Sequence, residues 1–256
     1  MRLSTLLLAS SVLLAPLVVA EAKDEALAKA VSASHRTDTF VARDKFRKPQ
    51  EELEFFGIKP NMTVVEISPG AGYWTEILAP YLKDKGTYYT AISPRQADSW
   101  KKKLEANPAV YGNVKVTQMG GDVAPPGSAD MVLTFRNIHN WMSSGTIDQQ
   151  LASFFKALKP GGILGIEEHR ASDKVPQDPK AANGYVRQDY TIQLAEKAGF
   201  KFVGSSEILA NPKDTKDWPK GVWTLPPTLA LGDQDREKYM AIGEADNYVL
   251  KFQKPK

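Results

Sequence analysis

The chain of 256 residues contains no cysteine. This absence excludes disulfides, thiolate metal sites and thiol nucleophiles. With three histidines and no cysteine the chain is poorly equipped for a structural zinc site, so we expect no metal. Charge of one sign is equally scarce, since 33 basic residues are balanced by 30 acidic residues spread along the chain. We therefore expect no nucleic-acid partner.

The chain also lacks an uninterrupted apolar run long enough to cross a membrane. The run from Leu6 to Val19 is broken by Pro16 and falls short of the roughly 20 residues that a spanning helix needs. Arg2 precedes this run and Ala20 follows it, which is typical of a secretory signal peptide. We predict a signal peptide over residues 1–20, cleaved near Ala20, no stable membrane anchor, and a periplasmic or secreted mature protein. Export without disulfides favours a bacterial periplasm.

A composition of 42% hydrophobic residues suffices for one α/β domain. We divide the mature chain into a charged N-terminal arm (21–48) and a domain (49–256) with an insertion at 211–246. Alternating strand and helix patterns predict a doubly wound sheet with helices on both faces. The predicted strands are 63–67, 87–92, 114–118, 131–135 and 163–167, and the predicted helices include 74–82, 96–106 and 147–158. Two later runs, 201–208 and 248–253, are expected to pair antiparallel, and the insertion between them is interpreted as a lid or surface subdomain.

The strongest local motif is a strand that runs into a glycine-rich turn and then into a helix. The strand is apolar except for Glu66, and the turn reads Ser68-Pro69-Gly70-Ala71-Gly72. Glycines let a ligand approach the backbone, and the start of the next helix offers it free N–H groups. A dinucleotide-binding fold would keep its ribose carboxylate about 20 residues beyond the turn, whereas here the acidic residue lies inside the strand.

This placement of Glu66 resembles the pattern of class I methyltransferases, an acidic residue, an aliphatic residue and then G-x-G-x-G, with Ser68 in place of the first glycine. The stretch Leu158 to Gly162 looks like the L-K-P-G-G turn of that family, and the arm and chain ending are similar to a group of predicted exported bacterial methyltransferases. The resemblance implies a Rossmann-like, seven-stranded, mostly parallel sheet with an antiparallel last strand. It also implies S-adenosylmethionine as cofactor and methyl transfer to a small or lipid-like acceptor.

The resemblance further implies a cofactor site along the carboxyl ends of the strands. The expected contacts come from the first motif, from Ser93 in place of the usual ribose carboxylate, from a position after the third strand and from two positions after the fourth. In chain order they are Glu66, Ser68, Pro69, Gly70, Gly72, Ser93, Asp122, Arg136 and Asn137.

Two histidines follow the fourth and fifth strands, where a parallel sheet gathers its functional residues. We predict His139, His169 and Glu168 as catalytic residues, because imidazole titrates near neutral pH and can accept a proton. The alternative is that these side chains only hydrogen-bond loops. The expected substrate contacts are Trp141, Arg187 and Tyr190, and their alternatives are a place in the core for the tryptophan and a helix-capping role for the segment around Asp189.

Two other functions remain open at this point. A non-catalytic exported protein that binds an adenosyl compound or another small ligand would account for Ser68 and Ser93, which replace a glycine and a carboxylate of the family pattern. A nicotinamide-dependent oxidoreductase is disfavoured because the chain lacks G-x-G-x-x-G with a carboxylate near residues 86–95. The sequence carries no signal for the acceptor or for the oligomeric state.

Overall fold

One mixed sheet of seven strands organises residues 24–256, the part of the chain that the computed structural model describes. The predicted signal peptide, residues 1–20, lies outside the described residues. The strands are β1 (Thr63–Ile67), β2 (Thr87–Ile92), β3 (Lys115–Gln118), β4 (Ala129–Phe135), β5 (Leu158–His169), β6 (Lys201–Ser206) and β7 (Asn247–Gln253).

The strand order is β3-β2-β1-β4-β5-β7-β6. The pairs among β1 to β5 are parallel, whereas β7 runs antiparallel to both β5 and β6. This topology confirms the predicted doubly wound sheet and the antiparallel pairing of its two C-terminal runs. The chain order reverses between β1 and β4, which opens a crevice at the carboxyl ends of those two strands.

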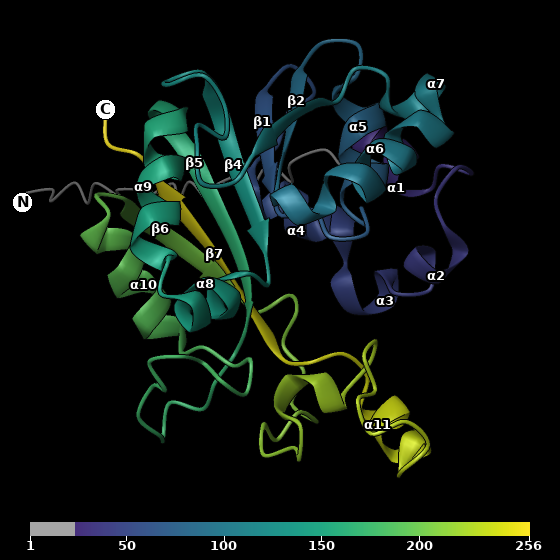
Figure 1. Cartoon of the computed structure of the whole chain (residues 1–256), viewed down its shortest axis with the longest axis vertical. Helices are drawn as coiled ribbons and strands as arrows, with labels where there is room; N and C mark the ends of the chain where they lie inside the picture. The colour runs from purple at the N-terminus through teal and green to yellow at the C-terminus, as the bar shows by residue number, and fades with distance from the viewer. Residues whose placement is uncertain (1–23) are drawn as a thin grey trace, which may run out of the picture.

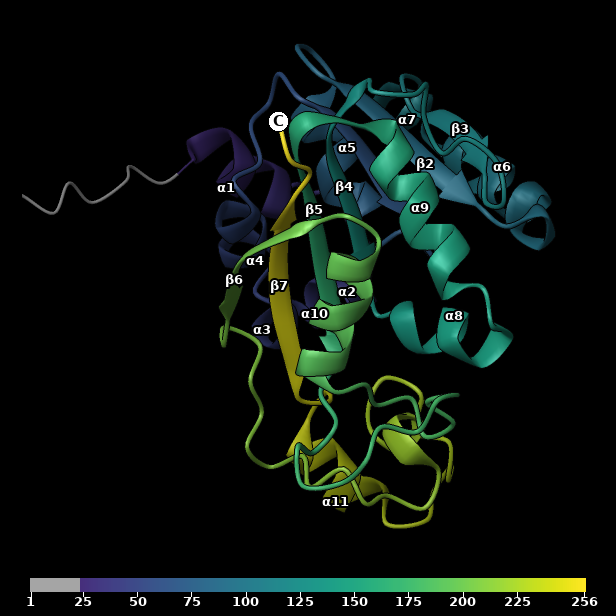
Figure 2. The same ribbon diagram turned by 90° about the vertical axis from the view of Figure 1, so that its left-hand side faces the viewer.

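Helices cover both faces of the sheet (Figures 1 and 2). The helices are α1 (Glu25–Val31), α2 (Asp38–Val41), α3 (Asp44–Arg47), α4 (Pro49–Phe56), α5 (Thr75–Leu82), α6 (Ala97–Ala106), α7 (Pro108–Tyr111), α8 (Ile138–Ser144), α9 (Ile147–Ala157), α10 (Gln188–Lys197) and α11 (Arg236–Ile242), with 3-10 turns η1 (Pro94–Gln96) and η2 (Gly221–Thr224). No helix in the described part of the chain is long and apolar enough to cross a membrane.

Alternate residues of the central strands pack into two separate hydrophobic cores, one on each face of the sheet. Val65 and Val132 pack with residues of α8, α9 and α10, whereas Val64 and Leu133 pack with residues of α1, α4 and α5. Successive strand residues point to opposite faces, and these strands are buried on both, so β1 and β4 are mostly apolar. The one charged residue of β1 is therefore informative, because Glu66 is only 1% exposed.

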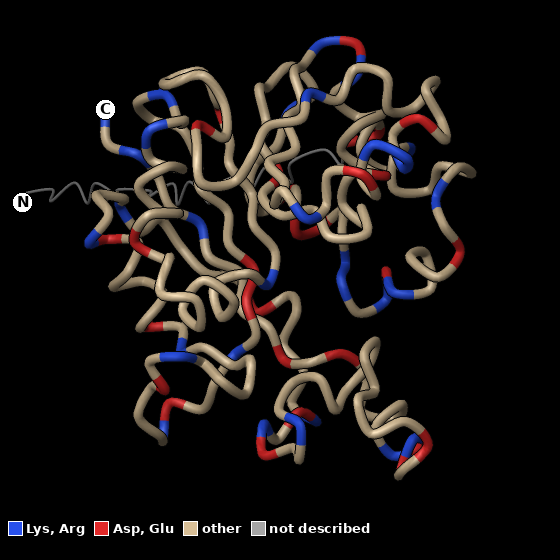
Figure 3. The backbone as a smooth tube through the Cα atoms, viewed as in Figure 1, with Lys and Arg blue, Asp and Glu red and all other residues tan. Residues whose placement is uncertain are grey.

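The N-terminal arm is packed against the domain despite its many charges (Figure 3). Leu27 of α1 is fully buried in the core that α5 shares. Arg36 donates two hydrogen bonds to Asp44, at 2.6 and 2.8 Å, and the amide of Thr37 donates to Glu76 of α5. These contacts bring α2 and α3 to the same end of the sheet as the glycine-rich turn.

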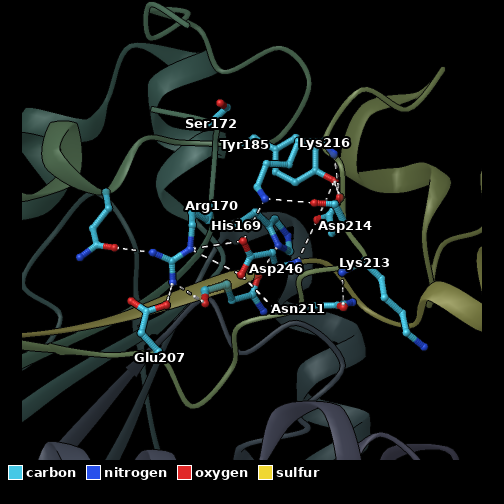
Figure 4. A network of polar contacts seen from close by, with 12 residues as sticks. His169, Arg170, Ser172, Tyr185, Glu207, Asn211, Lys213, Asp214, Lys216 and Asp246 are labelled. Atoms are coloured by element: carbon cyan, nitrogen blue, oxygen red, sulfur yellow. Dashed lines mark hydrogen bonds and ion pairs between the residues drawn. The ribbon is translucent and has the colours of Figure 1, made fainter. Parts of the chain in front are cut away.

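The insertion forms a small lobe beyond the carboxyl ends of β4 and β5, with η2 and α11 around a separate apolar cluster (Figures 1 and 2). Its anchor is Asp214, which is 2% exposed and accepts hydrogen bonds from the hydroxyl of Tyr185, the indole of Trp218 and the amide of Asp246 (Figure 4). Beside this anchor Arg170 bridges Glu207 and Asp246. The lobe is thus fastened to the sheet edge that carries the predicted site.

Candidate active site

A cavity of about 320 Å³ lies at the carboxyl ends of β1 and β4, where the topology predicts a ligand crevice. Four parts of the chain line it: the arm, the glycine-rich turn, the ends of β4 and β5, and the insertion. Its lining includes Phe40, Arg43, Arg47, Glu66, Ser68, Pro69, Gly70, Ala71, Tyr73, Trp74, Phe135, Arg136, Asn137, His139, His169, Val222, Trp223, Pro226, Pro227, Thr228, Glu244 and Ala245.

The glycine-rich turn presents unused backbone donors to this cavity. Among the described residues, the amides of Gly70 and Ala71 donate no hydrogen bond, whereas the amide of Gly72 donates to Pro69. Gly70 and Gly72 have φ values of +59° and +93°, and a Cβ at Gly72 would lie 2.3 Å from Cε of Lys103. Ser68 has a φ of +51° without being glycine, so it holds a left-handed conformation that costs roughly 1–2 kcal/mol.

Glu66 is a buried residue of β1 that connects this strand to the elements beside the turn. Its carboxylate accepts a hydrogen bond of 2.6 Å from the hydroxyl of Thr75 in α5 and another from the hydroxyl of Tyr88 in β2. Burial raises the pKa of Glu66 to about 7, although both hydroxyls stabilise the charged form. Glu66 was predicted to contact the cofactor. It also has a structural role, because its hydrogen bond with Thr75 connects β1 to α5, the helix that follows the turn.

His139 and Glu168 form a buried hydrogen-bonded pair across the ends of β4 and β5. Nδ1 of His139 lies 2.9 Å from Oε1 of Glu168, and the second carboxylate oxygen accepts from the amide of His139 at 3.1 Å. Burial lowers the pKa of His139, but the facing carboxylate more than offsets this, so the pKa lies above the ordinary value of 6.5. The carboxylate orients the ring, and the cavity side of the imidazole is left for a ligand.

His169 is held differently. Its Nδ1 lies 2.7 Å from Oδ1 of Asn247, whose side-chain amide donates at 2.8 Å to Glu167. Because that donation fixes the orientation of the Asn247 amide, Nδ1 of His169 carries the hydrogen and Nε2 carries the lone pair. Burial lowers the pKa of His169 to about 3, so the ring is neutral at pH 7 and is the weaker base of the two.

The three predicted catalytic residues also bring potential metal-ligating atoms within 4.8 Å of one another. Glu168 is fully buried, and its oxygens already accept hydrogen bonds from the ring and amide of His139 and from the amide of His169. A metal ion would have to break these bonds to gain a carboxylate ligand. We therefore interpret Glu168 as the residue that orients the histidines and not as a metal ligand.

Three arginines form a cluster in the same cavity, and of these only Arg136 was predicted from the sequence, as a cofactor contact. Arg43, Arg47 and Arg136 all donate to Glu244, at distances between 2.5 and 3.3 Å. The four-residue spacing of Arg43 and Arg47 was the available signal, because it places both side chains on one face of a helical segment. No local pattern pointed to Glu244, which lies 197 residues beyond Arg47.

The insertion lines one side of the cavity. Trp223 packs edge-on against His139 with ring centroids 6.0 Å apart, and Pro226 and Pro227 extend the same wall. On the opposite side Trp74 stacks on Phe135, and its indole N–H is buried without a hydrogen-bond partner among residues 24–256. An unpaired buried donor in a cavity wall favours a polar ligand there.

Seven predicted site residues are not part of this cavity lining. Two of them, Gly72 and Glu168, adjoin it in sequence, next to the lining residues Tyr73 and His169. Ser93 follows β2 and hydrogen-bonds Gln96, while Asp122 is exposed beyond β3 and pairs with Lys156 at 2.6 Å. These two lie toward the β3 side of the sheet.

The three predicted substrate contacts are also placed elsewhere. Trp141 packs against Phe154 in the core, because residues two apart on a helix point in nearly opposite directions and His139 faces the cavity. Arg187 pairs with Asp189 and holds the loop at Asp173 and Val175. Tyr190 belongs to α10 and packs, partly buried, against the core.

The raised pKa of Glu66 predicts a pH dependence of stability. Its pKa rises from 4.5 in the unfolded chain to about 7 in the folded protein, so the folded state binds the proton more tightly between these values. The free energy of unfolding should therefore fall by roughly 3 kcal/mol as the pH rises from 4.5 to 7. Glu66→Gln should remove that decline in urea titrations, whereas Glu51→Gln, at an exposed position of α4, should retain it. An unchanged slope in Glu66→Gln would contradict the assignment.

Comparison with known proteins agrees with this arrangement. Residues 65–164 match the family "Methyltransferase domain". No curated protein matches the chain by sequence. Solved structures with a similar fold include a SAM-dependent methyltransferase from Aquifex aeolicus, with 18% identity, a TM-score of 0.58 and coverage of 83% of this chain and 93% of that one.

Two further structures show the range of proteins with this fold. Phosphoethanolamine N-methyltransferase 2 of Haemonchus contortus, solved with S-adenosyl-L-methionine, has 15% identity, a TM-score of 0.56 and coverage of 90% of this chain and 60% of that one. The [4+2]-cyclase SpnF has 16% identity, a TM-score of 0.55 and coverage of 82% and 80%. Residues 24–256 thus have the fold of S-adenosylmethionine-dependent methyltransferases, and within them residues 65–164 match a methyltransferase domain.

Proposed function

We propose that this protein is an S-adenosylmethionine-dependent methyltransferase that acts on a small-molecule acceptor. The observation that carries the proposal is the shared cavity, which is lined both by the glycine-rich turn and by His139, the partner of the buried Glu168. The methyltransferase-domain match, from Val65 in β1 to Leu164 in β5, includes the turn and His139. Small acceptors are favoured because the cavity is about 320 Å³ and partly closed by the insertion.

The residues present fit the methionine portion of the cofactor. The unused amides of Gly70 and Ala71 precede α5, so they can bind a carboxylate at the start of a helix of eight residues. The indole N–H of Trp74 supplies a further donor from the same wall. When bound, S-adenosylmethionine supplies an electrophilic methyl group on a sulfonium.

His139 is the general base in this proposal. Its Nδ1–H is directed to Glu168, so Nε2 carries the lone pair that takes the proton from the acceptor heteroatom. With S-adenosylmethionine bound, its methyl group would pass to the acceptor heteroatom, which would leave S-adenosylhomocysteine, a methylated acceptor and a protonated His139. Glu168 stabilises the imidazolium, and the lobe behind Trp223 limits the access of water.

Residues 1–20 support a second part of the proposal, that the protein acts after export. A basic residue, an apolar run and small residues near Ala20 are the pattern of a cleaved signal peptide. The first described helix, α1, starts at Glu25, beyond the predicted cleavage position near Ala20, so cleavage would leave α1 and the contacts of the arm with α5 in the mature chain.

Cofactor binding tests the proposal directly. Gly70→Trp fills the cavity beside the turn, and we expect it to weaken the binding of S-adenosylhomocysteine at least 100-fold in calorimetric titrations of the chain from residue 21. Gly127→Trp is the matched control, because Gly127 has a similar φ of +64°, equally open surroundings and a position outside the cavity lining. Absence of binding to the folded wild-type protein, or equal binding to both variants, would refute the proposed cofactor site.

The His139–Glu168 pair predicts a specific titration. NMR of the histidine ring protons should give His139 a pKa above 6.5, and Glu168→Gln should lower that pKa to below 6.5, because burial then acts without the carboxylate. Glu196→Gln, at an exposed position of α10, should leave it unchanged. If the two variants gave His139 the same pKa as the wild type, Glu168 would not be the group that tunes the base.

A further inference from the structure

The arginine cluster concentrates positive charge on one wall of the cavity. Its members come from two distant places: Arg43 and Arg47 from α3 and its start, and Arg136 from the residue after β4. Arg43 binds Glu244 through Nε at 2.5 Å and Nη2 at 2.9 Å, Arg47 through Nε at 3.3 Å, and Arg136 through Nη1 at 3.2 Å. One carboxylate therefore receives three guanidinium groups.

The remaining acidic groups nearby do not balance this charge. Glu167 lies 3.9 Å from Nε of Arg136 and also accepts from Asn247. Burial and the neighbouring Glu167 raise the pKa of Glu52 well above its ordinary value, which favours its neutral form. The cluster thus retains more positive than negative charge on the side that faces the cavity.

Several N–H groups of these guanidinium groups also donate no hydrogen bond within residues 24–256. Arg47 is only 3% exposed, yet within residues 24–256 it donates a single hydrogen bond, and its two Nη groups donate none. Its guanidinium lies 4.4 Å from the ring centroid of Tyr73, which fixes the plane of the group. Nη1 of Arg43 and Nη2 of Arg136 likewise donate no hydrogen bond within that range. Guanidinium donors that line a cavity, one of them buried and two partly buried, match the oxygens of a carboxylate or a phosphate.

We propose that the methyl acceptor is an anionic small molecule whose carboxylate or phosphate binds to Arg43, Arg47 and Arg136. The inference rests on the proposed function, because it names the acceptor class for the same cavity. The anion of the acceptor is favoured over the carboxylate of the cofactor, since the free amides of Gly70 and Ala71 already offer the cofactor an anion site at the turn.

The other cavity walls indicate the rest of the acceptor. Phe40, Tyr73, Trp223 and the two prolines at 226 and 227 present aromatic and apolar surface around the arginines. An acceptor with an aromatic or aliphatic body and one anionic end would fill this space, with its nucleophile reaching His139.

The test uses three probes of similar shape that differ in charge: benzoate, phenyl phosphate and neutral benzamide. Calorimetric titration of the chain from residue 21, saturated with S-adenosylhomocysteine and also without it, should show binding of the two anions and at least tenfold weaker binding of benzamide. Arg43→Gln should weaken anion binding at least tenfold. Its side chain is 20% exposed, so the substitution is less disruptive than one at Arg47. Arg236→Gln, at an exposed position of α11, is the matched control.

Each outcome separates the acceptor site from the cofactor site. Loss of anion binding in Arg43→Gln with an unchanged affinity for S-adenosylhomocysteine would support the proposal. If Arg43→Gln instead weakened S-adenosylhomocysteine tenfold but spared methylthioadenosine, which lacks the carboxylate, the cluster would hold the cofactor and the proposal would fail. Equal binding of benzoate and benzamide by the folded wild type would also overturn it. A failure of S-adenosylhomocysteine to bind would count against the proposed function alone, because the anion titration without cofactor still tests the cluster.

Discussion

Burying a carboxylate away from water costs several kcal/mol unless other groups compensate its charge, and this chain buries three at the carboxyl ends of β1 and β5. Glu66, Glu167 and Glu168 are each at most 1% exposed. Each carboxylate has different partners. Glu66 accepts from the hydroxyls of Thr75 and Tyr88, Glu167 accepts from Asn247 and lies near Arg136, and Glu168 faces His139. The polar part of the site consists largely of groups that compensate these carboxylates.

Because the partners that compensate each buried charge differ, the titratable groups of this one site differ in protonation. Glu66 has neutral partners and keeps a raised pKa, whereas Glu168 faces His139 and has a lowered pKa. The same Glu168 raises the pKa of His139. His169 at the end of β5 is partly buried and hydrogen-bonded to the Asn247 amide, and its ring stays neutral. A base, its orienting acid and a neutral ring thus arise at the ends of two neighbouring strands, β4 and β5.

The fold could be predicted because its signals are local. Apolar runs broken by turn residues predicted the strands, and Glu66 followed by Gly70 and Gly72 predicted the position of the ligand crevice. The cavity then gathered most residues predicted from the first motif and from the ends of β4 and β5. Trp141 failed as a cavity contact because the helical period turns it away from His139 into the core.

The arginine cluster could not be predicted, because it depends on long-range packing. Arg136 and Glu244 are 108 residues apart, and they meet only when the insertion returns the chain to β7 beside β5. Arg43 and Arg47 reach the same place because the arm packs on α5 through Thr37 and Glu76. The chain was divided into arm, domain and insertion, yet residues of all three line one cavity.

Fold alone does not decide the chemistry, since a methyltransferase and a [4+2]-cyclase both align with this chain at TM-scores above 0.5. The position of the cofactor relative to His139 is what distinguishes methyl transfer from other uses of the fold. A crystal structure of residues 21–256 with S-adenosylhomocysteine measures that position. Our account predicts the amino-acid end of the ligand against Gly70 and Ala71, with its sulfur facing the cavity that His139 lines. A ligand bound elsewhere, or with its sulfur turned away from His139, would contradict it.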